Sequence, residues 1–395
     1  QMARDFHDEA FDRETELKLD IFRGYIREWL PVFLTGGGCR RVNILDFFAG
    51  PGRDTQGKKG SPLIIVEEVQ RYLTDASRPK ADGVAVHLYF NEFSGRKCDS
   101  LREEIARECG NSEFSVEVEN RDFPAAFEGH LPALRASRAA NLVILDQCGI
   151  KQVSPEVFRA LVNCAKTDII FFVSSSIVRR FRGEECVRRY FPGLSDEAIA
   201  VVDQASIHRC VCDYYRQLVP NTKSYFLAPF SIRKDANIYG LIFGTGNLLG
   251  LEKFLTVCWD KDRITGEANF NIDGDRFREE PSLFPEENVI RKQDRFREDL
   301  IRRIHLGEQT NNDLYRFTLE CGFLPRHARE ILGELQDRGL LTVAATDTSA
   351  RRMRKGAFYL GWDSYKTGQP KAVFEARIDP CDKPRLSGQK QPGTL

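Results

Sequence analysis

The stretch VNILDFFAGPG, residues 42–52, decides the fold of this chain of 395 residues. Its apolar beginning predicts a buried β-strand, which ends at Asp46 and leads directly into a turn. Gly50 and Gly52 can take positive φ angles in that turn and let a ligand come close to the backbone. A strand that ends at an acid and enters a glycine-rich turn is typical of the nucleotide pocket of doubly wound α/β domains.

The spacing of the glycines separates two classes of ligand. The dinucleotide pattern G-x-G-x-x-G needs a third glycine at position 55, where this chain has Thr55. The combination of Asp46, Phe48, Gly50 and Gly52 instead resembles the first motif of class I S-adenosylmethionine-dependent methyltransferases. The alternative is an ordinary turn without a ligand. We favour a cofactor site formed by these four residues, because the acid, the aromatic residue and both glycines occur together.

Strand-like and helix-like patterns alternate around this motif, which predicts a doubly wound, mostly parallel sheet. Six further apolar segments are expected to be strands. With the first strand at 42–47, the predicted strands are 84–90, 114–118, 141–145, 169–173, 225–230 and 238–243. Amphipathic patterns predict helices at 14–34, 63–73, 98–109 and 251–259, with Ser61 as a candidate N-cap.

The composition changes along the chain and predicts four parts. Residues 1–265 form the α/β domain, and residues 266–286, rich in glycine, proline and acids, form a linker or insertion. Residues 287–365 are expected to fold as a winged helix-turn-helix. Its three helices are predicted at 289–306, 311–321 and 325–338, and its wing at 340–344 and 357–362. Residues 366–395 are predicted to be a flexible tail, because they are rich in Pro, Gly, Lys and Gln.

The charge and cysteine content limit the possible partners and compartments. The net charge is zero, so contact with nucleic acid depends on local basic patches. No apolar run is long enough to span a membrane, and 11 scattered cysteines are typical of a cytoplasmic protein with reduced thiols. The pair Cys210 and Cys212, close to His208, lacks a second pair of ligands. We therefore expect buried thiols there, and the sequence predicts no metal site.

Acidic residues also follow the second and third predicted strands. The carboxyl ends of parallel strands share one edge of the sheet, so these acids are expected beside the glycine turn. Glu92 is positioned to accept hydrogen bonds from ribose hydroxyls, and Asp122 to accept one from an adenine amino group. Each acid alone could be an exposed loop residue. Together with Asp46, they make three acids at successive strand ends, and this arrangement favours a nucleoside site.

Asp146-Gln147-Cys148-Gly149 follows the fourth predicted strand, where methyltransferases keep their catalytic tetrapeptide. Amino-methylating enzymes usually have Asp or Asn, two prolines and an aromatic residue there. Asp146 is therefore a candidate catalytic residue that orients an acceptor amine. Cys148 is a second candidate, because a thiolate could attack C6 of a pyrimidine. Lys151 is the nearest cation that could activate it, and packing is the favoured role of Cys148.

Basic residues follow several of the predicted strands and also occur in the C-terminal part. Near the α/β site they form a candidate surface for a phosphate-bearing substrate, comprising Arg53, Lys58, Lys59, Arg179, Arg180 and Arg182. The alternative is a solvated surface of salt bridges, since Glu184 and Glu185 interrupt the arginine run. On the third helix and in the wing, the candidate nucleic-acid residues are Arg326, Arg329, Arg351, Arg352, Arg354 and Lys355. The alternative there is a protein-docking module.

Taken together, these motifs resemble the three-Cys-motif partner family. The matching stretches lie in order between residues 10 and 362, at 17–31, 46–52, 60–63, 145–149, 239–243, 249–253 and 259. The family usually has Asp-Pro-aromatic-Gly where this chain has residues 146–149. The resemblance implies a bacterial protein with a methyltransferase-like domain and a winged helix. It also implies a partnership with a radical S-adenosylmethionine protein that carries a three-cysteine motif.

The favoured function is therefore S-adenosylmethionine-dependent methyl transfer to a nucleic acid, DNA or RNA. The catalyst would mainly supply positioning, because the cofactor carries the reactive methyl group. One alternative is a non-catalytic partner that recruits a radical enzyme to nucleic acid. Another is a metal-dependent nuclease or other hydrolase, in which Asp46, Asp122 and Asp146 would converge on Mg²⁺.

Overall fold

The structure is a computed structural model that describes residues 10–36, 38–110, 113–146, 153–174, 207–234, 237–266, 292–346 and 353–377. The chain divides into two compact units, Gln1–Arg291 and Lys292–Leu395. The second unit therefore begins five residues later than the predicted boundary at 287. Each unit is described by itself below.

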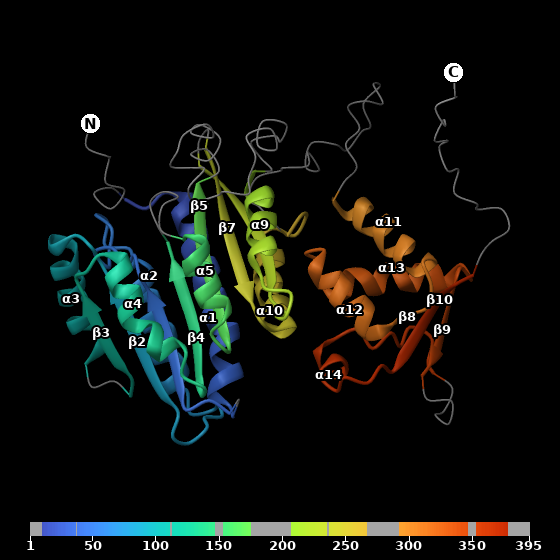
Figure 1. Ribbon diagram of the computed structural model, residues 1–395, viewed down its shortest axis with the longest axis horizontal. Coiled ribbons are helices and arrows are strands. Elements are labelled where there is room, and N and C mark those ends of the chain that lie inside the picture. Colours follow the sequence, from blue (N-terminus) through green and yellow to red (C-terminus); the bar gives the residue numbers. More distant parts are fainter. Residues whose placement is uncertain are drawn as a thin grey trace. The chain divides into compact units, whose positions relative to one another are not determined.

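The N-terminal unit is built on a seven-stranded sheet with the order β3-β2-β1-β4-β5-β7-β6 (Figure 1). Neighbouring strands from β3 to β5 pair in parallel, and β7 runs antiparallel to both β5 and β6. This arrangement confirms the predicted doubly wound, mostly parallel sheet. The strands are β1 Arg41–Asp46, β2 Ala85–Asn91, β3 Ser115–Glu119, β4 Ala139–Leu145, β5 Thr167–Ser174, β6 Phe226–Lys234 and β7 Asn237–Thr245.

The strand order reverses between β1 and β4. From β1 the chain moves outward through β2 to β3, and it then returns to the other side of β1 to form β4 and β5. The connections leaving β1 and β4 therefore diverge at the carboxyl ends of these two strands. In open α/β sheets, ligands bind at this reversal point. The motif at residues 42–52 thus lies where the topology favours a ligand.

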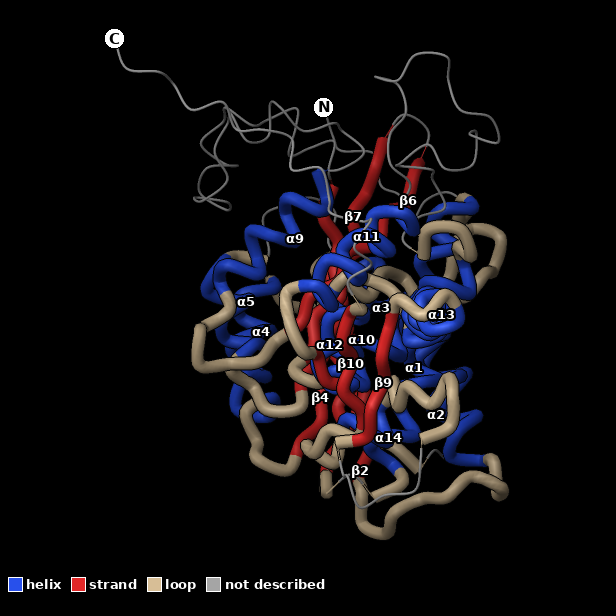
Figure 2. The backbone as a smooth tube through the Cα atoms, turned by 90° about the vertical axis from the view of Figure 1, so that its right-hand side faces the viewer, coloured by secondary structure: helices blue, strands red, loops and turns tan. Residues whose placement is uncertain are grey.

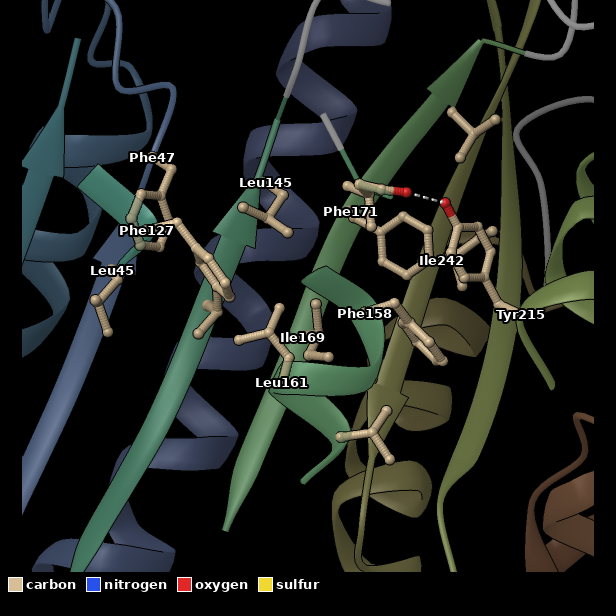
Figure 3. Packing of buried hydrophobic residues seen from close by; sticks show 14 of the residues in the cluster. Leu45, Phe47, Phe127, Leu145, Phe158, Leu161, Ile169, Phe171, Tyr215 and Ile242 are labelled. Atoms are coloured by element: carbon tan, nitrogen blue, oxygen red, sulfur yellow. Dashed lines mark hydrogen bonds between the residues drawn. The ribbon is translucent and has the colours of Figure 1, made fainter. Parts of the chain in front are cut away.

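Helices cover both faces of the sheet (Figure 2). One face is covered by α1 Arg13–Leu34, α2 Ser61–Thr74, α3 Gly95–Cys109 and α10 Leu248–Lys261. The other carries α4 Phe123–Leu134, α5 Pro155–Val162 and α9 Ile207–Leu218, whose buried side chains form one cluster with residues of the strands (Figure 3). In that cluster Tyr215 donates a hydrogen bond of 2.7 Å to the carbonyl oxygen of Val153.

The N-terminal helix α1 is fixed to the sheet by buried polar contacts. Tyr25 donates a 2.6 Å hydrogen bond to the carboxylate of Asp168 in β5. Burial raises the pKa of Asp168 to about 6. Arg27 makes two hydrogen bonds of 2.8 Å to Glu68, a buried acid of α2. Such bidentate pairs are geometrically specific, so α1 is held in a defined register on α2.

The C-terminal unit has the predicted three helices and a small sheet. The helices are α11 Lys292–His305, α12 Asn311–Glu320 and α13 Pro325–Asp337, followed by the short α14 Trp362–Tyr365. The strands are β8 Gln309–Thr310, β9 Leu341–Ala345 and β10 Ala372–Ala376, in the order β8-β10-β9. Thr310 and Asp313 form a capping box at the start of α12.

Two predictions for this unit were wrong. The strand that pairs with β9 is β10, whereas residues 357–362 form no strand and bury Phe358 and Leu360. The predicted tail from residue 366 therefore contains part of the folded unit. The strand was missed because it is short and follows Gly368 and Pro370, which are typical of a tail. Its signal is the alternation of buried and more exposed side chains, with Ala372 and Phe374 buried on one face of β10. Among the helices that the structure describes, none combines the length and apolar composition needed to cross a membrane.

Candidate cofactor and acceptor site

The glycine turn after β1 has the backbone conformation that its sequence requires. Gly50 has a φ of 68° and Gly52 a φ of 92°. A Cβ atom on Gly52 would lie 3.2 Å from Cδ1 of Leu101 in α3. The Ala49 amide donates to the carbonyl of Asn91 at 3.0 Å, so the turn is also tied to the end of β2. Glycine is therefore needed for conformation at both positions and for space at the second.

Asp46, predicted to bind the cofactor, has its carboxylate in internal hydrogen bonds. It is fully buried and accepts hydrogen bonds from the Phe48 amide at 3.0 Å and the Ser61 hydroxyl at 2.6 Å. Burial raises its pKa to about 7, although both hydrogen bonds oppose that shift. Ser61 is the first residue of α2, and Gly60 rather than Ser61 occupies the N-cap. Asp46 thus shapes the turn by joining it to the beginning of α2.

We predict that Asp46→Asn flattens the dependence of stability on pH. The folded-state pKa lies above the ordinary value of 3.8 for this side chain, so the folded protein binds the extra proton between about pH 4 and pH 7. This stabilisation is complete below pH 4 and is lost as the pH rises through 7. Between pH 5 and pH 8 the parent should lose about 3 kcal/mol more of its free energy of unfolding than the Asn variant. Urea unfolding of both proteins at the two pH values measures the difference, and equal losses would contradict it.

Glu92 lies beside the glycine turn, as its predicted role requires. One carboxylate oxygen accepts a hydrogen bond from the Gly50 amide at 3.0 Å, and the other accepts one from the Ser94 amide at 2.8 Å. The half-buried carboxylate therefore links the turn after β1 to the loop that leads into α3. Its two oxygens also have the geometry with which a carboxylate receives adjacent hydroxyl groups.

Phe93 is a site residue that the sequence analysis missed. Its side chain is 77% exposed and directly follows Glu92. A large apolar ring on the surface is informative when it stands beside polar groups at a ligand edge, because a flat ligand can stack on it. An aromatic residue immediately after a strand-end acid was the available signal.

The structure gives Asp122 and Phe48 local roles. Asp122 is exposed and caps α4 by accepting a hydrogen bond from the Ala125 amide at 3.2 Å. Phe48 stacks on Phe123, the first residue of α4, with ring centroids 5.2 Å apart. Phe48 therefore packs the segment before the glycine turn against the start of α4, the helix that Asp122 caps. A contact between Asp122 and adenine remains a prediction.

Asp146 at the end of β4 is paired with Lys18 of α1, a second residue that was missed. The ammonium nitrogen lies 2.5 Å from a carboxylate oxygen, and the side chains are only 15% and 16% exposed. Lys18 also lies 5.0 Å from the ring centroid of Phe172 in β5. The Asp146 charge contributes to the raised pKa of Asp46, which places both acids at the same edge. Cys148, the other candidate catalytic residue, lies outside the described residues.

The basic residues after β1 are engaged in ion pairs. Arg53 contacts Glu104 at 2.8 Å and Glu108 at 2.5 Å. Lys59 contacts Glu108 at 3.2 Å, and Lys58 contacts a glutamate of α1. These contacts favour the alternative of a salt-bridged surface over a phosphate site at these positions. Arg179, Arg180 and Arg182 lie outside the described residues.

In the C-terminal unit, the predicted basic residues differ in their surroundings. Arg326 and Arg354 are exposed, whereas Arg329 donates a hydrogen bond to the Leu360 carbonyl. Lys355 lies 2.5 Å from Asp337 at the end of α13, and both are about two-thirds exposed. Such a surface pair contributes little and can open to a partner. Arg351 and Arg352 lie outside the described residues.

The alternative of a metal-dependent hydrolase at the strand ends receives no support from this geometry. Asp46 and Asp122 are occupied by hydrogen bonds within the chain. Within the described part of the chain, the ligand atoms close enough to share an ion belong to Glu117, Glu119 and His130.

Comparison with known proteins identifies the type of domain at the C-terminus. Residues 269–348 match the family model described as the GMT-like wHTH domain, which confirms the winged helix. None of the curated proteins compared with this chain matches it.

Solved structures that resemble this chain include three with bound ligands. The first is P. horikoshii TYW2 in complex with MeSAdo, with 11% identity, a TM-score of 0.32 and coverage of 61% of this chain but 66%, just under two thirds, of that one. The others are the O-methyltransferase TomG from Streptomyces achromogenes with SAM, at 12% identity, and an O-methyltransferase from Bacillus cereus with SAH, at 14%. Both have a TM-score of 0.31 and cover 60% of this chain and 92% of theirs. The fold assignment rests on the strand order and pairing given above.

Proposed function

We propose that the N-terminal unit binds S-adenosylmethionine at the carboxyl ends of β1 and β2 and transfers its methyl group to a nucleic acid. The observation that carries this proposal is the contact between Glu92 and the Gly50 amide at the reversal point of the sheet. It brings an acid suited to ribose hydroxyls next to a turn that permits close approach of the backbone. In this proposal Phe93 stacks on the adenine, and Asp122 accepts a hydrogen bond from the adenine amino group.

Asp146 and Lys18 are the proposed acceptor site. A carboxylate can accept a hydrogen bond from a target amine and so orient its lone pair toward the methyl group. The ion pair with Lys18 holds the carboxylate of Asp146 in place at the end of β4. S-adenosylmethionine supplies the electrophilic methyl group when bound, so the chain needs only to position the acceptor and take up its proton.

A transfer assay tests this function directly. The full-length protein is incubated with S-adenosylmethionine labelled in its methyl group and with either RNA or DNA. We expect label in one nucleic-acid fraction, released from it by the matching nuclease. Cofactor binding without transfer to either polymer would instead favour the non-catalytic partner, which recruits a three-Cys-motif radical protein.

The second candidate, a docking role for the C-terminal unit, is favoured by the charges around α13. Glu334 pairs with Arg297 at 2.6 Å and Asp337 pairs with Lys355, so acids alternate with the basic residues near this helix. Duplex DNA repels such acids, whereas a protein surface with mixed charges accommodates them.

We predict that the wing binds nucleic acid with a strong dependence on salt. Each phosphate contact contributes about 0.9 to the slope of log K against log salt on duplex DNA. Replacing Arg351, Arg352, Arg354 and Lys355 by Ala should flatten that slope by up to about three units. Titrations at several salt concentrations measure it. An unchanged slope would assign the unit to protein docking.

A further inference from the structure

A cluster of two histidines and two glutamates lies under α4, on the face of the sheet away from α1. His87 comes from β2, Glu117 and Glu119 from the edge strand β3, and His130 from α4. The Nε2 atoms of His87 and His130 lie 3.4 and 3.7 Å from the same oxygen, Oε2 of Glu117. Ligand atoms of Glu117, Glu119 and His130 lie within 4.8 Å of one another. Two elements, β3 and α4, therefore place nitrogen and oxygen atoms close enough to share one ion, and His87 of β2 lies beside Glu117.

The other nitrogen of each ring is anchored. Nδ1 of His130 lies 3.0 Å from the Ala126 carbonyl oxygen, which can only accept, so Nδ1 carries the hydrogen. Nδ1 of His87 lies 2.8 Å from Oγ of Ser115, whose own hydrogen is directed to the Val86 carbonyl. The neutral form of the His130 ring therefore presents a lone pair at Nε2. This anchoring is the arrangement found behind metal-binding histidines.

The distances suit a metal ion better than direct hydrogen bonds. Ordinary hydrogen bonds between nitrogen and oxygen are about 2.7–3.2 Å long. Zinc binds nitrogen and oxygen at about 2.0–2.2 Å in a tetrahedron, so two of its ligand atoms lie about 3.4 Å apart. The two separations at Glu117 are close to that edge length. A lone pair on His130 and two carboxylates close to it create a position that a divalent cation would stabilise.

We propose that Glu117, Glu119 and His130 bind a Zn²⁺ ion, with His87 next to the fourth position. Imidazole and carboxylate are common zinc ligands. Glu119 is already held by the Tyr89 hydroxyl at 2.8 Å and by Arg121 at 3.1 Å, which fixes its orientation. A bound ion would join β3 and α4. Because Asp122 caps α4, an ion that holds α4 would also stabilise one side of the proposed cofactor site. The ion itself would take no part in the chemistry.

The test uses the full-length protein, stripped of metals with a chelator, and either Zn²⁺ or Co²⁺ alone. Competition with a chromophoric chelator gives the zinc affinity. Absorption of the Co²⁺ form distinguishes nitrogen and oxygen ligands from the chain's cysteines, because thiolates add a charge-transfer band. We expect one zinc site without thiolate character. Glu117→Gln and His130→Gln should each weaken it at least about 100-fold, the upper end of the loss caused by removing a ligand's hydrogen-bond partner.

His305→Gln is the matched control. This histidine is exposed on α11, and its Nδ1 also lies close to a backbone carbonyl, that of Ile301, at 2.9 Å. It should leave zinc binding unchanged. Thermal unfolding of the metal-free variants shows whether they fold as the parent does, and zinc should raise the Tm of the parent but not that of Glu117→Gln. Equal zinc affinity in the parent and both site variants would overturn the proposal, whatever the result with S-adenosylmethionine.

Discussion

Replacing Gly50 by Val is expected to reduce the affinity for S-adenosylmethionine at least about 100-fold, equivalent to about 2.7 kcal/mol. Gly50 has a φ of 68°, which a β-branched residue adopts only with strain. The new side chain would also enter the space through which the ligand approaches the backbone, and the amide that binds Glu92 would shift. Isothermal calorimetry with S-adenosylmethionine and with its demethylated product, S-adenosylhomocysteine, measures the change.

Gly83→Val provides the control for backbone strain. Gly83 has a φ of 74°, lies in an exposed loop before β2, and a Cβ atom there would meet open space. It should lower stability in a similar way and leave cofactor affinity unchanged. If both variants bind the cofactor as the parent does, the glycine turn is not part of a cofactor site.

The second large effect is expected at Asp146. Asp146→Ala should reduce methyl transfer at least about 100-fold, a loss typical of removing a group that acts on a reacting proton. Cofactor affinity should stay within a few-fold of the parent, because the carboxylate is proposed to contact the acceptor. The loss should appear mainly in kcat, since the interaction is strongest in the transition state. Single-turnover transfer and calorimetry measure the two quantities separately.

Lys18→Met accompanies this variant, because it removes the cation and keeps the carboxylate. It should reduce transfer less than Asp146→Ala, because the carboxylate stays and only the ammonium group that orients it is lost. Cys148→Ser should have little effect. A complete loss in Cys148→Ser, with a covalent adduct trapped on a substrate carrying 5-fluorocytosine, would make Cys148 the nucleophile instead.

Local patterns in the sequence were sufficient for the central part of the fold. The apolar run before Asp46 and the two glycines predicted β1 and its turn, because a strand and a positive φ depend on adjacent residues. Glu92 could likewise be placed by the glycine turn, since parallel strands end at one edge. The helices α4 and α5 were not predicted. Their signals were short, an N-cap at Asp122 or Ser154 followed closely by proline.

Contacts between distant segments could not be predicted in the same way. Lys18 and Asp146 are 128 residues apart, and only the folded sheet brings α1 to the end of β4. Arg53 was expected to bind phosphate, but α3 supplies Glu104 and Glu108 as its partners. Asp46 was expected to face the cofactor, and its complete burial instead requires hydrogen bonds within the chain. In each case burial or pairing in three dimensions decided the role of a charge that the sequence could only locate.

Calorimetric titration of the parent protein with S-adenosylhomocysteine, S-adenosylmethionine and NAD⁺ tests the central claim most directly. We expect one site for each of the first two ligands. Both should bind at least about 100-fold more weakly to Glu92→Ala, because a charged hydrogen-bond acceptor is lost. We expect no site for NAD⁺, since Thr55 replaces the third glycine of the dinucleotide pattern. Folded protein that binds neither S-adenosyl compound, or that binds NAD⁺ at the same edge, would contradict the claim.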